Sequence, residues 1–267
     1  MATDAELLAA YDDLRFYVPP APPAAHRYEL LGPVLRVTGR HRGFVSAARD
    51  VGVRGEALDA LIAEHRDYFA TRHEAVEWVT YGHDEPLDLG HRLLAAGFVP
   101  EPAETLLIGE AAEMTGRVAL PDGVRLRRVF ARADFDRIAV METAVWGKGV
   151  DWVADSLAAR ATLPGDEFAV YVAEAAIGSD APVVVSAGWL AVKPGTLFAG
   201  LWGGSTLAEW RRQGIYRALV AQRASLAVEL GVRYLEVHAS DNSRPVLERL
   251  GMRALTTTTP YVWTPAG

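Results

Sequence analysis

The apolar residues of the chain recur at helical spacing in two long segments. Residues 57–69 and 215–230 carry an apolar side chain at every third or fourth position, which predicts an amphipathic helix in each. The polar residues of the second segment fall on other faces, where we expect solvent: Arg217, Gln222, Arg223 and Glu229. Shorter helices are predicted over residues 1–18, 89–96, 133–145, 153–160 and, after Asn242, up to Gly251.

Short apolar or alternating runs between these helices predict strands. They cover residues 35–38, 77–81, 106–108, 124–129, 168–173, 183–192, 197–206, 234–239 and 256–263. Residues 177–182 are predicted to be a turn rich in Gly and Asp. The alternation of helices and strands indicates an α/β (α+β) protein. The small and polar stretch 111–122 is predicted to be a linker, and we expect domains at 1–115 and 116–267.

Composition narrows the class of protein. The chain has 267 residues, 50% of them hydrophobic, and a formal net charge of −7, which argues against nucleic acid as a partner. It contains no Cys, so disulfides, thiol nucleophiles and Cys-ligated metals are excluded. The acidic N-terminus lacks a signal-like pattern, and the longest apolar run, 183–192, is too short to cross a membrane. We expect a cytoplasmic protein without membrane contact, as a monomer or homodimer.

The segment from Glu209 to Leu219, EWRRQGIYRAL, joins a predicted strand to the second long helix. The first N–H groups of a helix have no intrahelical acceptor, and the helix dipole adds partial positive charge there. Gly214 lets an anion approach the backbone, and Arg211 and Arg212 offer bidentate contacts. This combination predicts a pyrophosphate site, although the sequence matches neither the Walker nor the dinucleotide-binding pattern.

The same residues resemble the phosphate-binding segment of the GNAT N-acetyltransferase superfamily, (Gln/Arg)-x-x-Gly-x-(Gly/Ala). Arg211 and Gly214 match, whereas Tyr216 stands where the family prefers a small residue; its ring either covers the cofactor or narrows its slot. The segment EVHASDNSRPVLERLGM also resembles the strand, Asn and short helix that follow in the family. The resemblance covers residues 124–263 and implies a mixed, mainly antiparallel sheet flanked by helices and splayed between its fourth and fifth strands.

The resemblance implies acetyl-CoA as cosubstrate and no metal. The acetyl carbonyl and pantetheine arm would contact the backbone near Gly204, Ser205 and Thr206, and Asn242 would contact the cofactor, although it also suits a helix cap. The remaining cofactor-binding candidates form the turn and helix start: Arg211, Arg212, Gln213, Gly214, Ile215 and Tyr216. The implied activity is direct acetyl transfer to a primary amine of a small molecule or peptide. The alternative is a non-catalytic acyl-CoA-binding or interaction module.

The catalytic groups are less defined by the sequence. The family often has a Tyr acid where this chain has Leu247, so Tyr216 or Tyr261 is a substitute candidate. His238 is a candidate base, against the alternative of a hydrogen-bonded strand histidine. Glu142 is another candidate base if the helix 133–145 lines the cleft; otherwise it lies on a solvated helix face.

The N-terminal half parallels the C-terminal half. The order of four features is the same in both halves: Gly55, the following helix, Glu77 and Gly97 correspond to Gly214, its helix, Glu236 and Gly251. The number of residues between Gly55 and Glu77 equals the number between Gly214 and Glu236. We interpret this as a tandem arrangement with a degenerate GNAT-like N-terminal half, against the alternative of two unrelated α/β segments. Val53-Arg54-Gly55 lacks the arginine-rich turn, so this half is expected to bind no cofactor.

Two further groups of residues bear on the kind of site that the chain contains. His83, Asp84, Asp88 and His91 have no metal-motif spacing. The many tryptophans are expected in the core, although some in an acceptor cleft would favour an apolar or aromatic amine. They are Trp146, Trp152, Trp189, Trp202, Trp210 and Trp263.

Overall fold

The computed structural model describes residues 2–147, 150, 152–163, 165–176 and 181–265. The chain divides into two compact units. The first contains Met1–Leu107, His238–Pro245 and Arg253–Gly267, and the second contains Ile108–Val237 and Val246–Met252. This division differs from the expected one after residue 115, because the last strand groups with the first unit. The points of division fall within β6 (Glu104–Glu110) and β11 (Tyr234–Ala239).

The first unit is built on a mostly antiparallel sheet. Its strands, in sheet order, are β1 (Arg27–Leu31), β2 (Val34–Thr38), β3 (Gly43–Ala47), β4 (Val76–Tyr81) and β12 (Arg253–Trp263), and β5 (Val99–Pro100) pairs with β12. The strands β3 and β4 run parallel to each other, whereas the pairs β1–β2, β2–β3, β4–β12 and β5–β12 are antiparallel. The final strand therefore completes the first unit by pairing with β4.

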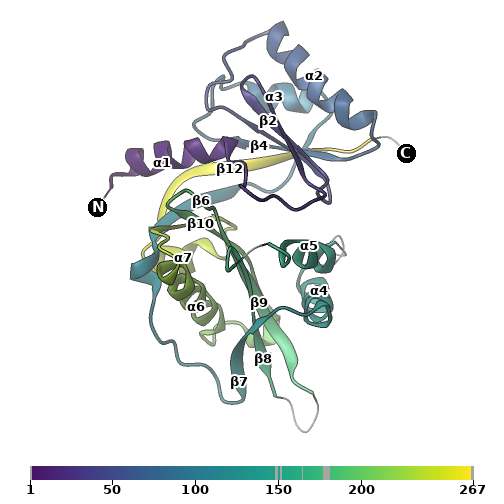
Figure 1. The fold of residues 1–267 in the computed structure, drawn as a ribbon. Helices are drawn as coiled ribbons and strands as arrows, with labels where there is room; N and C mark the ends of the chain where they lie inside the picture. Colours follow the sequence, from purple (N-terminus) through teal and green to yellow (C-terminus); the bar gives the residue numbers. More distant parts are fainter. Residues whose placement is uncertain (1, 148–149, 151, 164, 177–180, 266–267) are drawn as a thin grey trace. The chain divides into compact units, whose positions relative to one another are not determined.

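Two helices bury one face of this sheet. They are α2 (Glu56–Ala70) and α3 (Leu89–Ala95), and Figure 1 shows both on the same side of β2 and β4. The apolar stripe predicted for α2 is confirmed, since Leu58, Ile62 and Phe69 are fully buried. The chain begins with α1 (Asp4–Asp12), capped by Thr3, and the short 3₁₀ helix η1 (Asp13–Phe16).

The second unit has the element order that the sequence predicts. Its elements are β7 (Val124–Val129), α4 (Arg132–Trp146), α5 (Val153–Arg160), β8 (Phe168–Ala175), β9 (Val183–Val192), β10 (Phe198–Thr206), η3 (Ala208–Trp210), α6 (Ile215–Glu229), β11 and then α7 (Arg244–Arg249). The strands β7 to β10 pair antiparallel in sequence order, and β11 pairs parallel to β10.

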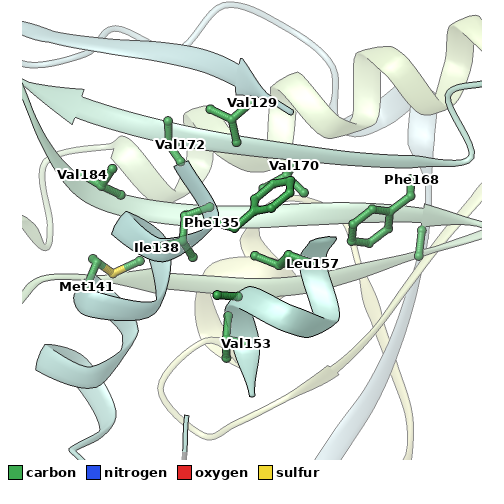
Figure 2. Packing of buried hydrophobic residues seen from close by; sticks show 13 residues of the cluster. Val129, Phe135, Ile138, Met141, Val153, Leu157, Phe168, Val170, Val172 and Val184 are labelled. Carbon is green, nitrogen blue, oxygen red and sulfur yellow. The ribbon is translucent and has the colours of Figure 1, made fainter. Parts of the chain in front are cut away.

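Helices cover both faces of this second sheet. Figure 2 shows the core on the α4 and α5 side, where Phe135, Ile138 and Leu157 pack on Val170 and Val172 of β8. A separate cluster containing Ile215 of α6 covers the other face. Figure 1 shows α6 on one side of β8 and β9 and the α4–α5 pair on the other. The sheet is therefore covered by α6 on one face and by α4 and α5 on the other.

The stretch predicted to be a linker is partly structured. Residues Ala111–Met114 form the 3₁₀ helix η2, in which Ala111 and Met114 are buried. The prediction was wrong for these residues because Met114 packs on the backbone of Gly109, where a Cβ would lie 3.1 Å from its Cε. Most of the turn expected at 177–182 lies outside the described residues. No helix in the described ranges has the length and apolar character needed to span a bilayer.

The two units repeat one local design. In each, a helix connects two parallel strands and begins after a glycine with positive φ: Gly55 (φ 58°) before α2 and Gly214 (φ 84°) before α6. The next helix is followed by a second such glycine, Gly97 (φ 89°) or Gly251 (φ 96°). The sequences of the two halves predict this correspondence, in which Gly55 matches Gly214 and Gly97 matches Gly251.

Candidate functional site

The predicted phosphate turn lies between β10 and α6. Arg212 (φ 62°) and Gly214 (φ 84°) both adopt left-handed backbone conformations, and the helix starts at Ile215 as predicted. The hydrogen bonding of the helix begins at Ala218, whose N–H donates to the Gly214 carbonyl at 3.0 Å. Within the described residues, the N–H groups of the helix's first turn have no acceptor, which leaves them available to an anion.

The side chains of the turn differ in what they contact. Arg211 donates its Nε to the Thr206 carbonyl at 3.0 Å, which ties the turn to the end of β10. Gln213 donates to the Glu209 carbonyl at 2.9 Å. Arg211 and Gln213 therefore shape the turn through these hydrogen bonds, and the side chains of Arg211, Arg212 and Gln213 are all exposed to solvent.

A pocket of about 430 Å³ adjoins this turn. Three arginines line it: Arg117 from the expected linker, Arg217 from α6 and Arg249 from α7, with Glu113 as a carboxylate neighbour. A Cβ on Gly214 would lie 3.7 Å from a guanidinium nitrogen of Arg217, so this arginine lies close to the helix N-terminus and also lines the pocket. The sequence analysis missed this pocket, because no local pattern links the linker to the ends of two helices.

The strands β10 and β11 separate after a short contact. They pair only from Phe198 to Gly200, opposite Tyr234 to Glu236, whereas β10 stays paired with β9 as far as Thr206. The register on β9 shifts between Gly203 (φ 67°) and Ser205, which marks a bulge with Gly204 (φ 88°) as the extra residue. The splay that the family resemblance implies is therefore present, and the bulge lies directly beside it.

The ring of Tyr216 packs against the bulge. A Cβ on Gly204 would lie 2.7 Å from its Cε2, so glycine at this position makes room for the ring. Burial raises the pKa of the Tyr216 hydroxyl. The ring therefore lies between α6 and β10.

Arg223 of α6 corrects a sequence prediction. We expected it on the solvent face, but the side chain is fully buried and its Nη1 donates to the carbonyls of Trp202 (3.0 Å) and Trp189 (3.3 Å). Gly188 provides the space, since a Cβ there would lie 2.8 Å from that nitrogen. Burial lowers the pKa of Arg223 to about 10. The guanidinium of Arg223 therefore hydrogen-bonds the backbone beside the bulge from the α6 side of the sheet.

Glu142 of α4 reaches the bulge from the opposite face. Its side chain is buried, and its Oε2 accepts a hydrogen bond of 2.7 Å from the Ser205 hydroxyl. The indole of Trp146 donates to the same hydroxyl at 2.9 Å. The other carboxylate oxygen, Oε1, is buried without a partner in the part of the chain that the structure describes. The alternative of a solvated helix face is therefore wrong.

Burial also sets the acid–base character of Glu142. Removing the carboxylate from water raises its pKa, and the hydrogen bond from Ser205 opposes this only in part. A carboxylate with a raised pKa is a better proton acceptor at neutral pH. Glu142 therefore remains a candidate for a general base, now as a buried side chain.

The other candidate residues lie in the first unit. His238 uses both ring nitrogens, Nε2 with the Tyr11 hydroxyl (2.7 Å) and Nδ1 with the Thr258 hydroxyl (3.2 Å), as the alternative of a hydrogen-bonded strand histidine expects. The hydroxyl of Tyr261 packs on Gly90 of α3, where a Cβ would lie 2.5 Å away. Asn242 is exposed in the turn before α7. We therefore assign no catalytic role to His238 or Tyr261.

Two observations concern other kinds of site. In the first unit, Arg54 directly precedes Gly55 at the start of α2 and pairs with Asp50 at 2.8 Å. Across the described ranges, no three His, Asp or Glu side chains gather in a way that suits a metal ion.

No protein-family model matches the chain, and no curated protein matches it. Solved structures do match it over its length. A GCN5-related N-acetyltransferase from Kribbella flavida has a TM-score of 0.67 at 17% identity, with 100% of this chain and 97% of that one covered. A tandem GNAT protein from the clavulanic acid biosynthesis pathway has a TM-score of 0.60 at 16% identity, with 99% of this chain and 97% of that one covered.

A GCN5-related N-acetyltransferase from Sphaerobacter thermophilus has a TM-score of 0.60 at 14% identity, covering 98% of this chain and 94% of that one. At identities this low the likeness shows the fold. The chain has the GNAT fold over nearly its whole length, and the match to a tandem GNAT protein agrees with the repeat read from the sequence. The expected fold class is confirmed.

Proposed function

We propose that this chain is an acetyl-CoA-dependent N-acetyltransferase that acts on a primary amine. The observation that carries the proposal is the carboxylate of Glu142, buried at Ser205 directly after the bulge of β10, with one oxygen unpartnered within the described residues. Burying a charge without pairing it is costly, and such groups concentrate at functional sites. An amine at that oxygen would lie beside an acyl group bound along the open edge of β10.

The opposite face of the same unit suits the donor. The free N–H groups at the start of α6 and the nearby arginines Arg117, Arg217 and Arg249 favour the phosphates of coenzyme A. The backbone of β10 beyond Gly200 is free of β11 and can pair with the amides of the pantetheine arm. The donor would then run from the arginine pocket to the bulge.

The residues present support direct transfer. Glu142 would take the proton from the amine as nitrogen bonds to the acyl carbon, and backbone N–H groups of the bulge would stabilise the negative charge that develops on the acyl oxygen. The carbon–sulfur bond breaks and the departing thiolate needs a proton. Leu247 is buried and has none to give, so we assign this role to the Tyr216 hydroxyl, whose ring contacts Gly204.

A non-catalytic acyl-CoA-binding module is the second candidate. It is favoured by two departures from the family pattern, Leu247 in place of the usual Tyr and Tyr216 in place of a small residue. It predicts binding of acetyl-CoA without amine-dependent release of thiol. The buried base at the bulge favours the enzyme, because a binding module has no need of it.

The test is amine-dependent release of coenzyme A thiol, measured with a panel of primary amines. The proposal predicts turnover with at least one amine class, lost in Glu142→Gln while acetyl-CoA binding remains. Acetyl-CoA binding without turnover on any amine would favour the binding module. Absence of both would overturn the assignment of the donor site.

A further inference from the structure

Three tryptophans on the α4–α5 face of the second unit form what we call the indole strip: Trp146, Trp189 and Trp202. Trp189 packs against the cluster under α4 and α5, and Trp202 is its direct partner across β9 and β10, so both point to that face. Trp146 reaches it through its bond to Ser205. Core packing was expected, but Trp146 is 62% and Trp202 is 44% exposed.

Glycines hold the two indoles of the sheet close to the backbone. A Cβ on Gly203 would lie 2.6 Å from Cζ3 of Trp189. A Cβ on Gly200 would clash with the indole nitrogen of Trp202. Any larger residue at these positions would displace the rings. Because the backbone lies under the indole of Trp202 and this side chain is 44% exposed, a planar group can stack on its outer surface.

The indole strip ends at a charged group on each side. At one end is Glu142, whose Oε1 is buried and has no hydrogen-bond partner among the described residues, so an ammonium group that reaches it would supply the missing donor. At the other, Glu236 forms an ion pair with Lys193 beside Gly200 and Trp202. Trp202 and Ser205 are two register positions apart on β9, about 7 Å along the strand. A short carbon chain between an amine and a ring spans such a distance.

We propose that the acceptor is a primary amine carried on a planar aromatic group. The amine binds at Glu142, and the ring stacks on Trp202 within the indole strip. This rests on the proposed function for the role of Glu142, whereas the binding of the amine does not depend on turnover. Aromatic stacking and cation–π attraction favour such a ligand over a saturated one of equal size.

The experiment compares 2-phenylethylamine with its saturated counterpart 2-cyclohexylethylamine by calorimetric titration of the full chain, with and without acetyl-CoA. We expect the aromatic amine to bind about tenfold more tightly. Trp202→Ala is expected to abolish this preference, and Trp202→Phe to retain most of it. Phe130→Ala, which removes an aromatic residue that is 67% exposed elsewhere in the same unit, is the matched control and is expected to change nothing.

The outcomes separate this inference from the proposed function. Equal affinity for the two amines, no binding of either, or an unchanged preference in Trp202→Ala would overturn the aromatic acceptor. Aromatic binding that requires Trp202, without any transfer from acetyl-CoA, would uphold the indole strip and count against the enzyme. Circular dichroism of each variant checks that the fold is retained.

Discussion

Replacing Glu142 by Gln tests the base with little change in shape. The amide oxygen of Gln can still accept the 2.7 Å hydrogen bond from Ser205, but the side chain no longer takes a proton. General-base catalysis contributes roughly 10²–10⁴-fold, so kcat is expected to fall by that factor, about 3–5 kcal/mol in the barrier. Acetyl-CoA affinity should stay unchanged, because the donor contacts lie at α6.

The same substitution is expected to change how the free energy of unfolding depends on pH. Burial raises the pKa of Glu142 above its ordinary value of 4.5 in the folded state. The folded protein therefore binds the proton more tightly than the unfolded chain, and stability is lost as pH rises through the folded-state pKa. Glu142→Gln lacks this loss, so its free energy of unfolding relative to wild type should grow from pH 4 to pH 8.

The assay combines steady-state kinetics with urea unfolding at both pH values. Glu229→Gln, which changes an exposed glutamate of α6, is the control and should match wild type in both. Wild-type kcat in Glu142→Gln would refute the base. A stability difference that shrinks toward pH 8 would refute the burial argument.

Three further predictions follow from particular residues. Gly214→Glu should abolish acetyl-CoA binding in calorimetry by placing bulk and charge at the helix N-terminus; Gly231→Glu, with a similar φ of 75° in open space, carries equal backbone strain and should bind normally. Arg217→Ala should weaken acetyl-CoA binding and flatten its salt dependence, and an unchanged salt slope would contradict a phosphate contact. Burial lowers the pKa of His65 to about 4, so stability should fall as pH drops from 6.5 toward 4; His65→Leu should remove that fall in unfolding experiments.

The elements with strong periodicity were predictable from sequence. The helix α6 and the strands β9 and β11 lie where their patterns place them, because each buries apolar side chains. The strand β1 was missed because it is an edge strand whose side chains are mostly exposed, so burial imposes no alternation on it. The strand β3 was missed because Gly43 and Ser46 interrupt its short apolar run.

The residues of the site also fall into those that the sequence could predict and those that it could not. Gly214 and the bulge glycines were predictable because their role is local: each supplies a backbone conformation that other residues adopt poorly. The burial of Glu142 and of Arg223 was not, since it depends on Ser205 and Gly188, which come from other elements. The arginine pocket likewise joins three segments that are distant in sequence.

The central claim is one acyl-CoA site per chain, at the start of α6. Calorimetric titration of the purified protein with acetyl-CoA tests it most directly, with Gly214→Glu measured beside it. We predict saturable binding at one site per chain that the variant loses. Two sites would mean that the first unit binds as well. No binding, or equal binding by Gly214→Glu, would contradict the account.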